Sequence, residues 1–136
     1  MFNEMNCPFC NPDKDPNQKI VLENTSCYFL QHVEEQDVLE GSGVIVPKQH
    51  RTLAFDLTKE EWNDTYDLLK LAREYLDNEY SPDGYTLGWN VGAASNQSIS
   101  HSHFHVIPRY NDEPLAGKGL RHWLKQPENR RNKETL

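Results

Sequence analysis

Three of the six histidines stand at alternate positions in one short run of the chain, His101-Ser-His103-Phe-His105. Successive side chains of an extended strand point to opposite faces, so this spacing predicts a strand with the three imidazoles on one face. Phe104 and Val106 are then expected to face an apolar layer. Three imidazole rings in a row serve packing poorly, and they indicate a shared metal, a shared anion or a chemical role.

Length and charge restrict the class of protein. A chain of 136 residues can bury the core of one domain. Its formal charge of -7 argues against binding to nucleic acids or to membrane surfaces, and the sequence has no apolar run of the roughly 18 residues that cross a bilayer. The N-terminus lacks the pattern of a secretion signal and the three cysteines suit a reducing compartment, so we expect a cytoplasmic protein.

The pattern of apolar residues predicts several short strands and one long helix. Thr58 and Glu61 form a capping box at the start of the helix, and the turn at 81–84 ends it by about Tyr80. The apolar stripe of this helix is predicted to contain Trp62, Tyr66, Leu69 and Leu76, with Leu68 and Ala72 widening it. Strands are expected at 19–23, 26–33, 44–46, 85–91 and in the histidine run, and a short ordered segment at 120–124. Without βαβ alternation, this order predicts an α+β domain with a mainly antiparallel sheet of about five strands.

The histidine run and three other segments together resemble the histidine-triad (HIT) family. His101-Ser-His-Phe-His105-Val-Ile is similar to the family signature, His-x-His-x-His followed by apolar residues. Val44-Ile-Val-Pro-Lys-Gln-His50 is similar to its apolar strand that ends in Pro-Lys-x-His, and Asn90-Val-Gly and Asn96-Gln-Ser98 match its asparagine and its phosphate loop. The resemblance implies a single HIT domain over residues 1–136. Residues 1–18 would be a zinc-binding N-terminal segment and loop, and residues 111–136 a C-terminal loop and basic tail.

The resemblance also implies an activity and the residues that carry it out. His103 would attack an α-phosphate and form a covalent nucleotidyl intermediate, while His105 would contact the same phosphate and assist proton transfer. The implied reaction releases a nucleoside monophosphate from a purine nucleotide conjugate, such as a dinucleoside polyphosphate or a nucleoside phosphoramidate, with no divalent ion needed for the chemistry. The implied substrate-binding residues are Asn90, Asn96, Gln97 and Ser98.

A second set of residues predicts a structural zinc site. Cys7 and Cys10 have the Cys-x-x-Cys spacing that lets two thiolates bind one ion, and two imidazoles would complete a closed tetrahedral site. Some HIT proteins use this arrangement, which implies His50 and His101 as the other ligands. Cys7-Pro-Phe-Cys10 also resembles a redox pair, but such pairs normally follow a core strand and open a helix, whereas here a proline-bearing loop follows. Cys27 is expected to be a small buried apolar side chain.

Other functions agree with parts of the pattern. The histidine run could supply metal ligands in an unrelated fold. Ser42, which stands where many HIT proteins have a further histidine, leaves open a nucleotide-binding module with weak or no catalysis, and a nucleotidyltransferase is a third possibility. His32 and His122 are expected to be structural or exposed, and the basic tail to be solvated, unless Arg121 or His122 reaches a phosphate. HIT proteins commonly form homodimers, and we expect one here.

Overall fold

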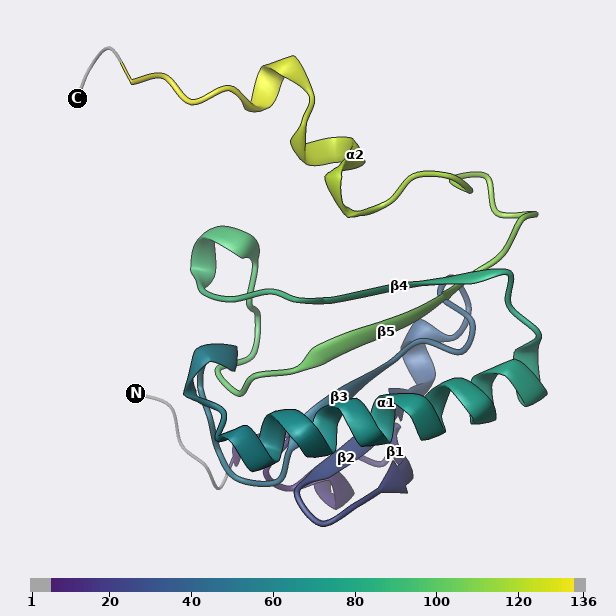
Figure 1. Cartoon of the computed structure of the whole chain (residues 1–136), viewed down its shortest axis with the longest axis vertical. Coiled ribbons are helices and arrows are strands. Elements are labelled where there is room, and N and C mark those ends of the chain that lie inside the picture. Colours follow the sequence, from purple (N-terminus) through teal and green to yellow (C-terminus); the bar gives the residue numbers. More distant parts are fainter. Residues whose placement is uncertain (1–5, 134–136) are drawn as a thin grey trace.

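Five strands form one antiparallel sheet in the computed structural model, which describes residues 6–133 (Figure 1). The strands follow the order β1-β2-β3-β5-β4 across the sheet, and each neighbouring pair is antiparallel. They are β1 (Gln18–Glu23), β2 (Cys27–His32), β3 (Gly43–Pro47), β4 (Gly84–Trp89) and β5 (Phe104–Arg109). The predicted α+β class and five-stranded sheet are confirmed. Residues 1–5 of the predicted N-terminal segment and residues 134–136 of the predicted tail lie outside the described residues.

One long helix, α1 (Lys59–Tyr80), lies across one face of the sheet (Figure 1). The short helix α2 (Leu120–Leu124) forms where an ordered segment was predicted, and it stands beyond β4 in the C-terminal segment. Short 3₁₀ helices connect these elements: η2 (Pro12–Lys14), η3 (Val33–Glu35), η4 (Ala54–Asp56), η5 (Ala93–Ser95) and η6 (Pro127–Asn129). None of the helices in the described range combines the length and apolar character needed to cross a membrane.

The sheet has an apolar core on one face and a second buried cluster on the other. Alternation along each strand separates the two sets, as expected for a pleated sheet. Phe29, Ile45 and Val106 pack with residues of α1 in the first cluster. The second cluster consists of Cys7, Phe9, Leu30 and Val46. Phe104 and Val106 belong to the helix side, which confirms their predicted orientation toward an apolar layer.

Helix α1 begins and ends where predicted, but its buried face is rotated from the predicted stripe. Thr58 caps the helix, and its capping box with Glu61 is formed. Trp62 and Tyr66 are 43% and 60% exposed, so they lie outside the core stripe. The ring of Trp62 instead packs against the ring of Trp89 on the edge strand β4, with the two ring centroids 5.4 Å apart. The buried residues of α1 are Glu61, Thr65, Leu68, Ala72 and Leu76.

Strand β5 begins later than the histidine spacing predicted. The strand starts at Phe104, so only His105 of the three histidines lies within it. The segment before Phe104 makes two hydrogen bonds to the end of β3 and the segment after it, in place of pairing as part of the strand. The amide of Ser102 donates to the carbonyl of Arg51, and the ring of His101 donates to the carbonyl of Pro47.

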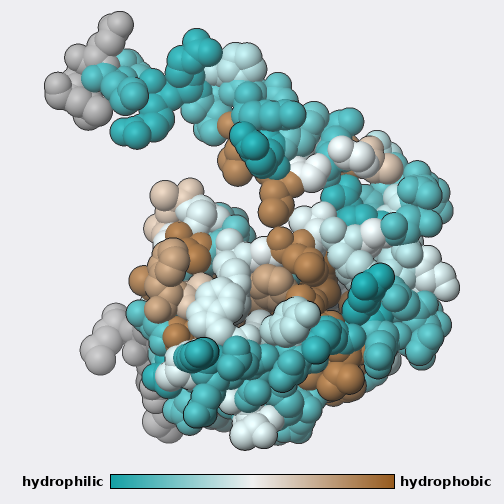
Figure 2. Space-filling view, in the orientation of Figure 1, coloured by the Kyte–Doolittle hydropathy of each residue, from teal (hydrophilic) through white to brown (hydrophobic). Residues whose placement is uncertain are grey.

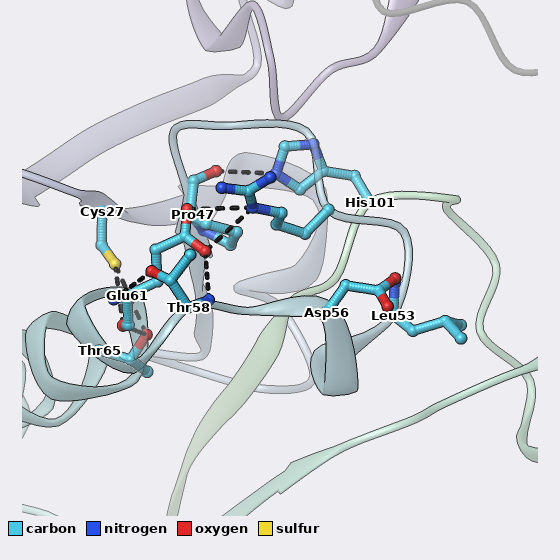
Figure 3. Close-up of polar contacts among 9 residues, drawn as sticks. Cys27, Pro47, Leu53, Asp56, Thr58, Glu61, Thr65 and His101 are labelled. Atoms are coloured by element: carbon cyan, nitrogen blue, oxygen red, sulfur yellow. Dashed lines mark hydrogen bonds and ion pairs between the residues drawn. The ribbon is translucent and has the colours of Figure 1, made fainter.

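Glu61 joins the start of α1 to Arg51, in the segment that follows β3 (Figure 3). Its carboxylate accepts hydrogen bonds from the side chain of Arg51 at 3.0 and 3.2 Å and from the amide of Thr58 at 2.8 Å. Burial by itself would raise the pKa of Glu61, but these hydrogen bonds and the charge of Arg51 outweigh it and hold the pKa below its ordinary value of 4.5. Since the carbonyl of Arg51 accepts from Ser102, this network supports the histidine segment directly.

Replacing the Glu61 carboxylate should destabilise the fold in a pH-dependent way. Because the folded-state pKa lies below the unfolded one, the ionised carboxylate stabilises the fold above about pH 4.5, and this contribution is lost as the pH falls through the folded pKa. We expect Glu61→Gln to lower the free energy of unfolding by about 1–3 kcal/mol at pH 7 and by less at pH 3. Urea titrations at both pH values measure this difference. The neighbouring Glu60→Gln should cost under about 1 kcal/mol, and an equal loss in both variants would contradict this role for Glu61.

Candidate active site and metal centre

A pocket of about 370 Å³ opens on the face of the sheet opposite α1. His103 and His105 line it, and Val44, which pairs with His105 in the sheet, lies beside them. Other apolar walls come from Phe9, Leu30 and Ile99. Carboxylates and a further imidazole also border the pocket, from Asp15, His32, Glu34 and Glu35. The site therefore offers imidazoles, an apolar middle and several polar side chains, a combination typical of small-molecule sites.

One hydrogen bond determines which nitrogen of the neutral His103 ring carries the proton. Its Nδ1 lies 2.9 Å from the carbonyl oxygen of His101. Because a carbonyl oxygen only accepts, Nδ1 carries the proton and Nε2 of the neutral ring keeps a lone pair. Burial lowers the pKa of His103, although the carbonyl contact and the charge of Glu35 oppose part of that effect. The ring is therefore neutral at pH 7, with a nucleophilic nitrogen.

His105 brings a second, half-buried imidazole beside the first. The two ring centroids are 4.9 Å apart. Burial lowers the pKa of His105, and electrostatic repulsion between the charged forms of His105 and His103 lowers it further. Among the described residues, Nε2 of His105 has no hydrogen-bond partner although it is buried. A buried polar atom without a partner is costly, so a bound group that pairs with this nitrogen would relieve the cost.

Of the four predicted substrate-binding residues, one is among the described residues that line this pocket and the other three are not. Ser98 lines it. Asn90 directly follows β4, whose last residue, Trp89, pairs with Phe104 next to His103 in the chain. Gln97 closes its own loop, since its amide group donates to the carbonyls of Thr52 and Ile99 and accepts from the amide of Gly92. Asn96 is exposed and adopts a left-handed backbone conformation.

Several residues of the pocket were not identified from the sequence. His32, expected to be structural or exposed, lines the pocket, and its Nε2 lies 3.0 Å from a carboxylate oxygen of Asp15. Phe9 and Pro8 come from the N-terminal turn and also form part of the wall. The only sequence signal for Phe9 was its place between the two cysteines. Arg121 and His122 border a different depression, beside β4, and neither lines this pocket.

The four predicted metal ligands come together in one cluster. One ligand atom from each of Cys7, Cys10, His50 and His101 lies within 4.8 Å of all the others. Nδ1 of His101 is 3.4 Å from each sulfur atom and 3.2 Å from Nδ1 of His50, and Sγ of Cys10 is 3.3 Å from Nδ1 of His50. A tetrahedral zinc ion with two sulfur and two nitrogen ligands requires separations of about 3.3–3.8 Å between them. The observed spacing is close to that requirement.

The orientation of the His101 ring also fits a metal. Nε2 of His101 donates to the carbonyl of Pro47 at 2.8 Å (Figure 3), which leaves the Nδ1 lone pair directed at the cluster. Burial lowers the pKa of His101 to about 4, so the ring is neutral at pH 7 and able to coordinate. Metal-binding histidines are commonly oriented in this way, by a hydrogen bond from the ring nitrogen that does not bind the metal to a carbonyl oxygen. The donor set and its geometry therefore suit a zinc ion held by four protein ligands.

Comparisons with known proteins place this arrangement in a family. The profile of the HIT domain matches residues 14–112. The adenosine 5′-monophosphoramidase hnt1 of Schizosaccharomyces pombe is 27% identical over 124 residues, which cover 91% of this chain and 90% of that protein. The bis(5′-adenosyl)-triphosphatase of Saccharomyces cerevisiae is 31% identical over 102 residues, 72% of this chain and half of that protein. A crystal structure of a HIT family protein from Bacillus anthracis superposes with a TM-score of 0.71 and 26% identity, covering 91% of this chain and 89% of the other.

Purified protein should contain about one zinc ion per chain, held by the four-residue cluster. Elemental analysis measures the content directly. Cys7→Ser and Cys10→Ser should each reduce it to well below one, because a hydroxyl is a much poorer zinc ligand than a thiolate. Cys27→Ser is the matched control, since the Cys27 sulfur lies instead beside Thr65 on α1, and it should keep the full metal content. Equal zinc in all three variants would contradict the assignment.

Proposed function

Because the chain belongs to the HIT domain family, we propose that it is a nucleotide hydrolase that cleaves at the α-phosphate of purine nucleotide conjugates. The observation that carries the proposal is the pair of neighbouring imidazoles in the wall of a pocket, the buried His103 and the half-buried His105. The names of two relatives support the class of substrate. One is an adenosine 5′-monophosphoramidase and the other a bis(5′-adenosyl)-triphosphatase.

In the proposed reaction, His103 acts as the nucleophile. Its Nε2 lone pair attacks the α-phosphorus, so that a phosphorus–nitrogen bond forms as the bond to the leaving group breaks and the leaving group takes up a proton. Water then attacks the same phosphorus, the bond to Nε2 breaks, and a nucleoside monophosphate is released. Covalent catalysis of this kind divides one difficult displacement into two easier steps.

The neighbouring groups have separate proposed roles. His105 contacts a phosphate oxygen and assists proton transfer, which agrees with its buried Nε2 atom that has no partner within residues 6–133. Asn90 and Ser98 are proposed to position the phosphate, the first from the end of β4 and the second from the pocket rim. For Gln97 and Asn96, contact with substrate remains a proposal, and the hydrogen bonds of Gln97 also shape their loop. The apolar walls would take the purine base.

The metal in this proposal is zinc and its role is structural. Four protein ligands, Cys7, Cys10, His50 and His101, would close the coordination sphere, so the ion would fix the local fold without contacting substrate. The thiolates require a reducing environment, which agrees with a cytoplasmic location. Within one domain over residues 1–136, the 1–18 segment would supply two of the ligands, and 111–136 would form a loop and basic tail.

A nucleotide-binding module with little catalysis is the second candidate. The observations in its favour are Ser42, a buried residue where many HIT proteins have a further histidine, and Asn96, where a small residue is usual before the Gln-Ser pair. Tight AMP binding without turnover of any conjugate would favour this function. A nucleotidyltransferase would instead transfer the nucleotidyl group to a supplied sugar phosphate.

The hydrolase should release AMP from adenosine 5′-phosphoramidate or from diadenosine triphosphate. We expect His103→Ala to lower the rate by about three orders of magnitude or more, because the nucleophile is lost. Chromatography of the products measures both rates. The matched control is His122→Ala, a histidine on α2 that does not line the pocket, and it should keep the wild-type rate. No release by the wild type, or equal release by His103→Ala, would contradict the proposal.

A homodimer is also part of the proposal. Strand β4 is at an edge of the sheet, so one side of its backbone is not paired within the described chain. Apolar side chains gather near this edge and the C-terminal segment, as Figure 2 shows. Leu87 on β4 and Leu120 on α2 border one depression and are 38% and 62% exposed. An exposed edge strand with apolar neighbours is a common site of association.

Sedimentation equilibrium should therefore give twice the chain mass at micromolar concentration. Leu87→Glu on β4 should shift the protein toward the monomer, because it places a charge in the proposed interface. Val33→Glu, at a residue of η3 that is 63% exposed, is the matched control and should remain dimeric. A monomeric wild type would contradict the proposed assembly.

A further inference from the structure

One short turn, Cys7–Cys10, supplies two of the four proposed metal ligands and also forms part of the wall of the substrate pocket. Cys7 and Cys10 enclose Pro8 and Phe9, and both of these middle residues line the pocket. The side chain of Phe9 is 6% exposed. Its ring centroid lies 5.2 Å from that of His103 and 5.8 Å from that of His101. Phe9 therefore contacts one ring of each site.

The turn is held both by the four-residue cluster and by apolar packing of Cys7 and Phe9 against Leu30 and Val46. Strand β1 starts only at Gln18, so the turn precedes the sheet. Within the turn, the amide of Cys10 donates to Sγ of Cys7. A hydrogen bond from the Gln18 side chain to the carbonyl of Pro8, 2.9 Å long, holds its outer side. The two sulfur atoms contact His50 and His101, which lie 40 or more residues away in the chain.

A metal ion would change how firmly this turn is held. Two thiols and two imidazoles at such short separations attract one another weakly, and deprotonated thiols would repel. An ion that binds all four donors replaces these contacts with coordination bonds and offsets the conformational entropy lost by ordering the turn. With the cysteines fixed, the residues between them have little freedom, and the Phe9 ring is presented to the pocket in one position.

We propose that the metal and the nucleotide bind cooperatively, because the Cys7–Cys10 turn contributes ligands to one site and the Phe9 and Pro8 wall to the other. The inference rests on the proposed function, since the nucleotide pocket is assigned there. Metal binding offsets the conformational entropy that is lost when the wall becomes ordered, so the nucleotide binds to a wall that is already ordered. The nucleotide in turn stabilises the ordered turn and raises the affinity for the metal.

Two routes from the cluster to the active site have different measurable effects. The carbonyl of His101 orients the His103 ring, so this route affects the chemical step. Phe9 lines the pocket but has no part in the proposed chemistry, so this route affects nucleotide affinity. Measurement of binding, in place of turnover, therefore isolates the Phe9 route.

The experiment measures both halves of the coupling. Calorimetry gives the Kd for AMP with zinc-loaded protein and with protein stripped by a chelator, after circular dichroism has compared the two folds. We expect zinc removal to weaken AMP binding by about tenfold, within the usual range for coupled sites. Competition with a chromophoric chelator gives the affinity for zinc with and without saturating AMP. Linkage requires that the two factors be equal.

Phe9→Ala is the variant that distinguishes a shared wall from general stabilisation. It keeps all four metal ligands, and we expect full zinc content together with AMP binding that no longer depends on zinc. Phe9→Leu should restore part of the coupling, because a large apolar side chain again fills the wall. If the stripped protein unfolds, the zinc competition with and without AMP provides the test, and the coupling should again disappear in Phe9→Ala.

Two results would overturn the inference. One is an equal Kd for AMP with and without zinc in the wild type, and the other is undiminished coupling in Phe9→Ala. Failure of the proposed function looks different: zinc-loaded wild type would neither bind AMP nor release it from any conjugate. That outcome would remove the nucleotide pocket and the coupling together, whereas normal AMP release without coupling would remove only the coupling.

Discussion

The arrangement of the site depends on one residue, His101, which makes three kinds of contact at once. Its carbonyl accepts a hydrogen bond from Nδ1 of His103, and its Nε2 donates a hydrogen bond to the carbonyl of Pro47. Its remaining ring nitrogen faces Cys7, Cys10 and His50. Each contact restricts a different atom of the same residue, so the ring that faces the cluster and the backbone that orients the neighbouring histidine cannot move independently. The four-residue cluster and the His103 ring are therefore parts of one unit.

The sheet separates this unit from the apolar core while connecting both to α1. On β3, Ile45 packs under the helix and Val44 lines the pocket. The N-terminus of α1 is also linked to the site by hydrogen bonds, since Glu61 binds the Arg51 side chain and the Arg51 backbone accepts from Ser102. A buried carboxylate is unfavourable unless it is paired, and here the pairing attaches the histidine segment to the helix. The fold thus stabilises the segment that β5 itself does not include.

Sequence patterns predicted some elements well because the responsible interactions are local. The capping box of Thr58 and Glu61 involves residues three apart, and the structure confirms it. The opposite orientations of Phe104 and His105 follow from the pleat of a strand. The helical stripe was predicted less well, because hydrophobicity by itself favours Trp62 over Glu61 for the core. The structure buries Glu61 against Arg51 and leaves Trp62 at the sheet border beside Trp89.

The types of residue in the chain, and their alternation, were enough to suggest paired imidazoles, a two-cysteine metal site and an α+β domain. They could not reveal which nitrogen of His103 carries the proton, because that depends on a backbone carbonyl and not on a side-chain type. Nor could they place Phe9 or the Asp15–His32 pair in the pocket, since these residues meet the histidines only through the strand order β1-β2-β3-β5-β4. Contacts between residues far apart in the chain depend on how the strands pair and in which register. Tertiary structure supplies that information, and it is what turns separate motifs into one site.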